Sequence, residues 1–192
     1  ENINIENEYI SRILKSFKNY KRGSLFDKKI IWDCGNGATG NILKNLIKYL
    51  PGKHIVLFSE IDGNFPNHEP DPTKEENLSE LKKNIINLNA DFGIAFDGDG
   101  DRISIMKKNG ELIPGDILTS YLSLSINDKS KDIILDIKSS SVAKNIIEKL
   151  GFNVQIWKTG HSHIKSKMKE IGTLLAGEMS GHIFFSDEYY GY

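Results

Sequence analysis

Hydrophobic and polar positions follow two different spacings along this chain, and each spacing predicts its own kind of element. Where apolar residues recur three and four positions apart, the pattern predicts a helix with one buried face. The expected helices are Asn7–Phe17, a segment with its apolar face from Ile42 to Leu50, Asn77–Asn87, Gly115–Ile126 and Val142–Leu150. Short apolar runs between turn residues instead predict buried strands. The expected strands are Lys28–Cys34, His54–Phe58, Ala90–Phe96, Ile103–Met106, Asp132–Ile137, Asn153–Trp157 and Thr173–Ala176.

One helix shows how the spacing assigns side chains to the core. Within Asn77–Asn87, we expect Leu78, Leu81, Ile85 and Ile86 to face inward.

Strands and helices alternate in chain order, which is typical of α/β folds with parallel strands. The alternation pauses after Ile103–Met106, where a turn at Lys107–Gly110 predicts a hairpin, and a second series begins at Glu111. We therefore expect two consecutive Rossmann-like α/β domains with mixed or parallel sheets, residues 1–110 and 111–192, the second incomplete at its C-terminus. The lack of an initial Met and the abrupt end at Tyr192 suggest a piece of a longer protein.

Composition removes several classes of function. The chain carries 25 basic and 26 acidic residues, so a net charge of −1 gives no electrostatic case for nucleic-acid binding. It has no apolar run near the roughly 20 residues that cross a bilayer and no signal-peptide pattern at its start, so no membrane partner is expected. A single Cys34 cannot form an internal disulfide and fits a reducing, cytoplasmic location.

The densest chemistry lies between two expected strands, in the run Asp-Gly-Asp-Gly-Asp-Arg at positions 97–102. Asp97, Asp99 and Asp101 would repel one another in a partly buried loop unless a cation lay among them. Gly98 and Gly100 let such a loop curl so that its carboxylates converge. Ligation by oxygen alone favours a hard ion such as Mg²⁺ or Mn²⁺ over zinc or copper.

This run has two other interpretations. An EF-hand loop also opens Asp-x-Asp-x-Asp, but it needs Gly at its sixth position and Glu at its twelfth, where this chain has Arg102 and Lys108. A solvated acidic turn is the remaining structural interpretation. Arg102 argues against it, because a guanidinium beside a metal site suits a loop that handles phosphate.

A glycine-rich turn follows the first expected strand and matches the spacing of a dinucleotide-binding fingerprint. Gly35, Gly37 and Gly40 fit Gly-x-Gly-x-x-Gly, and Glu60 lies about twenty residues further on. A single match of this kind is a weak signal. The favoured interpretation is a tight strand-to-helix turn whose glycines permit close packing.

Further polar groups follow expected strands, and each has a structural alternative. His68, in a loop with three prolines, is a metal or phosphate ligand or, more simply, an anchor of that loop. Lys138 is placed for an anionic ligand or is an ordinary surface lysine, and the serines after it are expected to cap a helix. His161 and His163 form an alternating pair without a nearby carboxylate or Cys, which disfavours a metal site.

Near the end of the chain, Glu178 and Ser180 stand two residues apart between glycines. They offer a compact acceptor and donor set for vicinal sugar hydroxyls, or they belong to an ordinary loop.

Taken together, these segments resemble the α-D-phosphohexomutases, the phosphomannomutase/phosphoglucomutase family. The resemblance rests on Asp-Gly-Asp-Gly-Asp-Arg, Asp-Cys-Gly-Asn-Gly, Gly-Asn-Phe-Pro-Asn-His, Thr-Gly-His-Ser-x-Ile-Lys and Gly-Glu-Met-Ser-Gly-His. It covers nearly the whole chain, as the second domain and most of the third of a four-domain enzyme. Many members carry a second His where this chain has Glu69, so a role for two histidines there is not carried over.

The resemblance implies roles for particular residues. Asp97, Asp99 and Asp101 would bind Mg²⁺, with Arg102 assisting phosphoryl transfer. The resemblance also implies that Lys138 contacts the substrate and that His161 lies in the active site. Glu178 and Ser180 are implied as contacts to the 3- and 4-hydroxyls of the sugar, and His182 as a general acid or base.

The activity implied is a reversible exchange between hexose 1-phosphate and hexose 6-phosphate through a phosphoserine and a bisphosphorylated sugar. Met179 points to the phosphomannomutase/phosphoglucomutase branch, with phosphoglucosamine mutase as an alternative within the family. The Ser-His-Asn-Pro loop of the phosphoserine is absent from this sequence. We therefore expect partner domains of the same protein, weak Mg²⁺ binding and no turnover by this piece alone. A non-catalytic module that binds a metal or nucleotide is the competing class.

Overall fold

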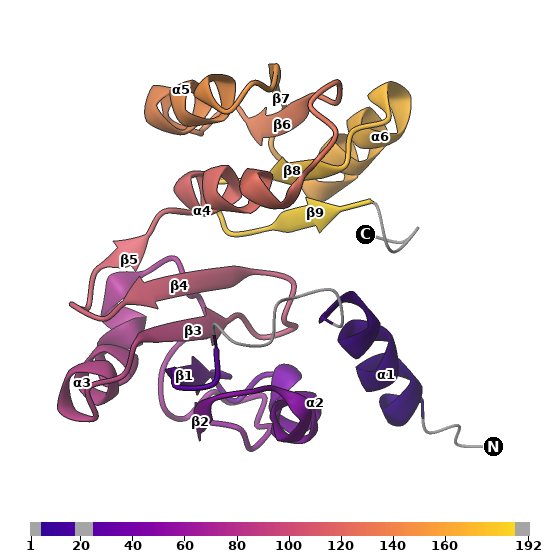
Figure 1. Ribbon diagram of the computed structural model, residues 1–192. Helices are drawn as coiled ribbons and strands as arrows, with labels where there is room; N and C mark the ends of the chain where they lie inside the picture. The colour runs from indigo at the N-terminus through magenta and orange to yellow at the C-terminus, as the bar shows by residue number, and fades with distance from the viewer. Residues whose placement is uncertain (1–4, 18–24, 187–192) are drawn as a thin grey trace. The chain divides into compact units, whose positions relative to one another are not determined.

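The computed structural model describes residues 5–17 and 25–186, and it divides the chain into two compact units (Figure 1). The first unit comprises Glu1–Asp101 and Ile105–Leu112, and the second comprises Arg102–Ser104 and Ile113–Tyr192. The predicted domain boundary after residue 110 stays a prediction. Within the described residues, no helix is long and apolar enough to cross a membrane.

The first unit is built on a sheet with the strand order β2-β1-β3-β4-β5. Its strands are β1 (Lys29–Asp33), β2 (Lys53–Leu57), β3 (Phe92–Phe96), β4 (Ile103–Lys107) and β5 (Leu112–Ile113). The central strand β1 pairs in parallel with β2 and β3. Because parallel neighbours end at the same edge, the loops after these three strands gather at one side of the sheet.

Helices cover both faces of this sheet. They are α1 (Glu6–Phe17), α2 (Thr39–Leu46) with a 3₁₀ turn Ile47–Tyr49, and α3 (Ser79–Asn87) after a 3₁₀ turn Glu75–Leu78. Side chains alternate along β1: Ile31 packs in a core with Leu81 and Ile85 of α3. Its neighbours Ile30 and Trp32 line a cavity of about 390 Å³ together with residues of α1 and α2. Strand periodicity thus places a hydrophobic layer on each face.

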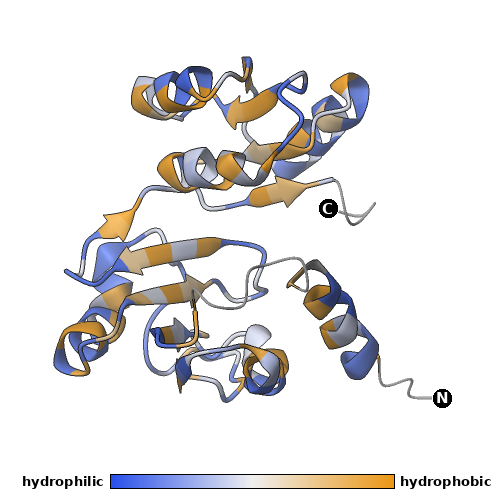
Figure 2. Ribbon diagram, viewed as in Figure 1, coloured by the Kyte–Doolittle hydropathy of each residue, from blue (hydrophilic) through white to orange (hydrophobic). Residues whose placement is uncertain are grey.

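The second unit repeats this arrangement on a sheet with the order β7-β6-β8-β9. Its strands are β6 (Ile133–Asp136), β7 (Val154–Trp157), β8 (Leu175–Gly177) and β9 (Ile183–Phe185), and its helices are α4 (Gly115–Leu122) with a 3₁₀ turn Ser123–Ser125, α5 (Ser141–Lys149) and α6 (His161–Ile171). The central strand β6 is parallel to β7 and β8, whereas β9 runs antiparallel to β8. Figure 2 shows the strands as the most hydrophobic ribbons and the helices striped with polar residues.

The central strand of the second unit again divides its side chains between two cores. Ile133 and Leu135 pack with Ala143 and Ile147 of α5 on one face. On the other face, Ile134 packs with Ile164 and Met168 of α6. The predicted serine cap is confirmed, since Ser140 Oγ accepts the Ala143 N–H at 3.2 Å.

The predicted fold class, two consecutive α/β units with mixed sheets, is confirmed. Two details of the prediction differ from the structure. Ile86 is 55% exposed rather than inward, because Leu81 and Ile85 already fill the face of α3 that meets the sheet and Ile86 lies about 100° further around. Helix α6 and strand β9 were not predicted at all, although Ile164 and Met168 have helical spacing.

Candidate functional site

The predicted metal ligands occupy the carboxylate loop (Asp97–Asp101), which follows β3 at its C-terminal end. One carboxylate oxygen each of Asp97, Asp99 and Asp101 lies within 4.8 Å of the others. Asp97 is only 3% exposed, whereas Asp99 and Asp101 are exposed. Asp97 Oδ1 accepts the Gly100 N–H at 3.0 Å, and Gly100 has a φ of +82°, which an L side chain rarely adopts. The structure therefore brings the three predicted carboxylates together in one curled turn.

The glycine turn (Gly35–Gly40) supports the carboxylate loop from the side. Ala38 N–H donates to the Gly98 carbonyl at 2.8 Å. A Cβ on Gly37 would lie 2.6 Å from that same carbonyl oxygen, and a Cβ on Gly40 would clash with the Ser59 backbone. The space beside these glycines is thus filled by the protein's own backbone, which supports the close-packing interpretation of the motif.

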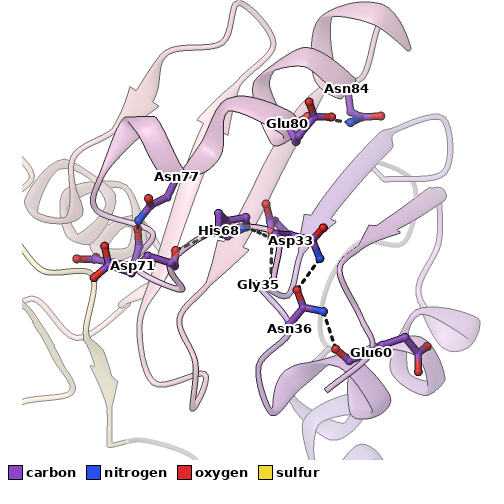
Figure 3. Close-up of polar contacts among 11 residues, drawn as sticks. Asp33, Gly35, Asn36, Glu60, His68, Asp71, Asn77, Glu80 and Asn84 are labelled. Carbon is purple, nitrogen blue, oxygen red and sulfur yellow. Dashed lines mark hydrogen bonds and ion pairs between the residues drawn. The ribbon is translucent and has the colours of Figure 1, made fainter. Parts of the chain in front are cut away.

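A partly buried ion pair attaches the proline-rich loop (Asp62–Pro72) to the end of β1, as Figure 3 shows. His68 Nε2 lies 3.1 Å from Asp33 Oδ1, which also accepts the Gly35 N–H at 2.9 Å. The other ring nitrogen, Nδ1, lies 2.8 Å from the Glu69 carbonyl. The hydrogen bond to Asp33 raises the pKa of His68 above its usual value, against the opposing effect of burial. Both ring nitrogens are occupied, so the structure supports His68 as a loop anchor.

Asn36 fixes the same region from the glycine turn (Figure 3). Its Nδ2 donates to the Glu60 carbonyl at 2.7 Å, and its Oδ1 accepts from Asn67 Nδ2 at 2.7 Å. The proline-rich loop in turn approaches the carboxylate loop, since a Cβ on Gly98 would meet Phe65 and Pro70 at 3.4 Å. The carboxylate loop is therefore held by two other loops of the first unit.

In the second unit, the Glu178 loop (Glu178–His182) carries three of the predicted site residues in mutual contact. His182 Nδ1 lies 2.8 Å from Glu178 Oε2 and 2.9 Å from Ser180 Oγ. Glu178 Oε1 accepts the Gly160 N–H at 2.6 Å, and the Glu178 side chain is 2% exposed. Burial raises the pKa of Glu178, but the hydrogen bonds from His182 and Gly160 outweigh it and hold the pKa below its usual value.

The other predicted residues of the second unit lie at the ends of its elements. His161 is the first residue of α6, and its ring centroid is 6.3 Å from that of His182. Arg102 forms an isolated antiparallel bridge with His182, and both belong to the second unit. Lys138 follows β6 by two residues and is exposed. In the described part of the chain, the carboxylate trio is the one group of three or more potential metal ligands that converges.

Sequence reasoning passed over the acidic residues that hold these loops from beneath. Asp33, Asp116 and Asp136 are each 1% exposed. Asp33 and Asp136 close their strands β1 and β6. An Asp as the last residue of an apolar strand was the available signal, because a buried carboxylate at a strand end must find hydrogen-bond donors in the following loops.

Comparison with known proteins places both units in one family. The family model for phosphoglucomutase/phosphomannomutase, alpha/beta/alpha domain II, matches residues 7–110, and that for domain III matches residues 114–191. A phosphomannomutase/phosphoglucomutase of Pseudomonas putida is 42% identical over all of this chain and 41% of its own length. A phosphomannomutase of Methanocaldococcus jannaschii is 36% identical over 97% of this chain and 42% of its own length.

Solved structures show the same relationship. A phosphoglucomutase/phosphomannomutase family protein from Burkholderia thailandensis superposes with a TM-score of 0.86 at 36% identity, over 99% of this chain and 41% of that chain. An Aspergillus fumigatus N-acetylphosphoglucosamine mutase in complex with GlcNAc-6P and magnesium shares the fold, with a TM-score of 0.71 at 21% identity, over 95% of this chain and 41% of that chain. This chain thus spans about two fifths of the length of these relatives, and it belongs to the phosphoglucomutase/phosphomannomutase family.

Proposed function

We propose that this chain supplies the metal-binding and sugar-binding parts of a phosphohexomutase, which interconverts hexose 1-phosphate and hexose 6-phosphate through a phosphoserine and a bisphosphorylated sugar. The observation that carries the proposal is the convergence of the three carboxylates after β3 in a chain of this family. Ligands of open α/β sheets bind beyond the carboxyl ends of the strands, and both sets of predicted residues lie at such ends. The cytoplasmic location remains part of this proposal.

The carboxylate loop fits a magnesium ion by its donor set. Three carboxylates within 4.8 Å of one another repel strongly, and a hard divalent cation relieves that repulsion. Asp97, Asp99 and Asp101 would hold the ion, which when bound supplies positive charge against the transferring phosphoryl group. Within the turn, the Gly100 N–H donates to Asp97 Oδ1 at 3.0 Å, which orients this carboxylate. Arg102, next in sequence, would bind phosphate oxygens through its guanidinium.

The second unit would bind and orient the sugar. With Nδ1 of His182 hydrogen-bonded to Glu178 Oε2, the proton that this histidine gives or takes is the one on Nε2. Glu178 therefore fixes the ring orientation of the proposed acid or base. Ser180 is the proposed hydroxyl contact, together with Glu178. The exposed side chains of Lys138 and His161 are the proposed contacts to anionic substrate groups.

Substrate preference within the family is tested with the full-length product of the gene that encodes this chain. Glucose 1-phosphate, mannose 1-phosphate and glucosamine 1-phosphate are supplied in turn with Mg²⁺ and a hexose bisphosphate activator. We expect turnover of the glucose and mannose phosphates. Selective turnover of glucosamine 1-phosphate would instead identify a phosphoglucosamine mutase, and no turnover of any sugar would favour the non-catalytic module.

A substitution in the carboxylate loop tests the proposed metal site. Asp99→Asn removes one carboxylate charge from an exposed position of the carboxylate loop, so we expect kcat/KM to fall about a thousandfold, as when one electrostatic contribution to a phosphoryl-transfer site is lost. The control is Asp128→Asn, in which an exposed turn aspartate of the second unit is changed in the same way. Equal activity of the two variants would remove the carboxylate loop from the mechanism.

Because the chain spans about two fifths of its relatives, the 192 residues alone are expected not to turn over. Incubation with glucose 1-phosphate and a bisphosphate activator should leave glucose 6-phosphate undetected. Mg²⁺ binding to this chain, measured by calorimetry, should also be weak. Turnover by the purified chain would contradict the division of labour proposed here.

A further inference from the structure

Asp136 occupies a central place beneath the loops of the second unit. It is the last residue of β6, the middle parallel strand of its sheet, and it is 1% exposed. A carboxylate at this depth is costly to bury unless hydrogen-bond donors surround it. The loops that follow the parallel strands β6, β7 and β8 all begin at this edge, so each can reach Asp136.

Three donors from three different loops meet this one carboxylate. Asp136 Oδ1 accepts Ser139 Oγ–H at 2.7 Å and the Met179 N–H at 3.2 Å. Its Oδ2 accepts Thr159 Oγ1–H at 2.9 Å. Ser139 adjoins Lys138, Thr159 is two residues before His161, and Met179 lies inside the Glu178 loop. Every loop that carries a proposed substrate contact after these three strands is thus bound to Asp136.

Two further buried carboxylates accept hydrogen bonds from two of these loops. Asp116 Oδ2 of α4 accepts the Ser140 N–H at 2.7 Å, and Glu178 Oε1 accepts the Gly160 N–H at 2.6 Å. The loop after β6 is therefore held by Asp136 and Asp116, and the loop after β7 by Asp136 and Glu178. Asp136 is the residue to which all three loops are hydrogen-bonded.

We propose that Asp136 is a positioning residue, which sets the relative placement of Lys138, His161 and the Glu178–His182 pair through its hydrogen bonds to Ser139, Thr159 and Met179. The proposal deepens the proposed function and rests on it. Asp136 touches no reacting atom. It acts on the rate because groups that must contact one sugar phosphate together lose efficiency steeply when one of them moves by about 1 Å.

The test uses three variants in the full-length gene product, each assayed where circular dichroism shows it to be folded. Asp136→Ala removes both acceptor oxygens and so all three hydrogen bonds, and kcat/KM should therefore fall about a hundredfold. Asp136→Asn keeps the shape: its oxygen can accept from Ser139 and Met179, while its NH₂ donates to the Thr159 hydroxyl, which also accepts. The Asn variant should therefore retain activity within about twofold of the wild type. Thr173→Val is the matched control, because Thr173 is 1% exposed and bonds to the Asp132 carbonyl at the opposite end of the sheet.

Three results would overturn the proposal. They are activity of Asp136→Ala equal to that of Thr173→Val, equal losses in the Asn and Ala variants, or a loss that disappears when the rate is divided by the fraction of folded protein. Equal losses in Asn and Ala would show that the charge matters rather than the placement. If Asp136→Ala does not fold, Thr159→Val decides, since it frees one loop and should lower kcat/KM about fivefold.

A second measurement separates this proposal from the proposed function. Hydrogen–deuterium exchange should rise in Asp136→Ala at the backbone of residues 138–140, 159–161 and 178–182 together, and not in Thr173→Val. If the wild-type protein turns over no hexose phosphate, the mutase proposal fails while exchange still decides whether Asp136 ties the loops. If hydrogen–deuterium exchange in these three segments is unchanged in Asp136→Ala, Asp136 has no positioning role, even in an active enzyme.

Discussion

The central strands of the two units end in the same residue type and use it differently. β1 ends at Asp33 and β6 at Asp136, and both side chains are 1% exposed. Asp136 accepts hydrogen bonds on both oxygens, from hydroxyls and one backbone amide. Asp33 accepts from Gly35 N–H and His68 on Oδ1 alone, and among the described residues its buried Oδ2 has no hydrogen-bond partner.

The difference shows that an aspartate at the same position of a repeated architecture can hold its loops with or without a titratable donor. In the second unit, hydroxyl and amide donors keep their protons across the physiological pH range. In the first unit, the lock depends on an imidazole, whose charge changes near neutral pH. The hydrogen bond between His68 and Asp33 should therefore respond to pH, whereas the three hydrogen bonds to Asp136 should not.

Among the tests of this comparison, the largest effect is expected from the chemistry of the second unit. His182→Gln removes the proposed acid or base while keeping a polar group beside Glu178, so kcat of the full-length protein should fall about a hundredfold. The Mg²⁺ concentration for half-maximal rate should stay unchanged, because the carboxylate loop is in the first unit. His163→Gln is the control, since this exposed histidine is given no role. A comparable loss in both variants would contradict the assignment.

A smaller effect is expected when the titratable hydrogen bond between His68 and Asp33 in the first unit is removed. His68→Gln removes a partly buried charged hydrogen bond and should lower the free energy of unfolding by about 2 kcal/mol at pH 5.5. The pKa of His68 is raised in the folded state above its usual 6.5, so the stability it contributes is complete below pH 6.5 and is lost as pH rises through the folded-state pKa.

The measurement is urea denaturation of wild type and His68→Gln from pH 5.5 to pH 9. The difference between the two proteins should shrink steadily as the pH rises. A difference that stays constant over this range would mean that the pKa of His68 is the same in the folded and unfolded states, and the contrast between the two units would disappear.

Thr159→Val provides the counterpart in the second unit. It removes one neutral donor to Asp136 and should cost about 1 kcal/mol of unfolding free energy. Because hydroxyl and amide groups do not titrate between pH 6 and pH 9, the cost should be the same at both ends of this range. A cost that varied with pH as strongly as that of His68→Gln would show that the two locks behave alike.

The smallest effect is expected at a surface contact that involves neither Asp33 nor Asp136. Lys107 and Glu111 form an ion pair of 2.6 Å, but both side chains are at least half exposed. Glu111→Gln should change the midpoint of urea denaturation less than any other variant described here, since solvent and salt screen such pairs. A loss as large as that of Thr159→Val would mean that surface pairs contribute to these units as much as buried locks do.

Local sequence spacing predicted the parts of the site that form within one turn. Asp97, Asp99 and Asp101 converge because alternate residues of a curled loop can point inward, and Glu178, Ser180 and His182 meet for the same reason. The predicted segments of the alternating fold also correspond to strands and helices in the structure, with ends shifted by a few residues. The roles of these side chains toward substrate remain predictions.

Contacts between distant segments were beyond reach of the sequence. His68 and Asp33 are 35 residues apart, and Asp136 meets a backbone amide 43 residues away. Such pairs follow from which strands are neighbours, and apolar periodicity does not order the strands. Helix α6 is a different case, because the four-residue spacing of Ile164 and Met168 is a local signal of a helix.

Cys34 gives the first unit a reporter that needs no engineering. It is the single cysteine of the sequence, it is 0% exposed, and burial raises the pKa of its thiol to about 11. Iodoacetamide should consequently alkylate this chain only during moments when the strand β1 region opens. The rate of alkylation at increasing urea then measures that opening separately from the second unit, which offers the reagent no thiol.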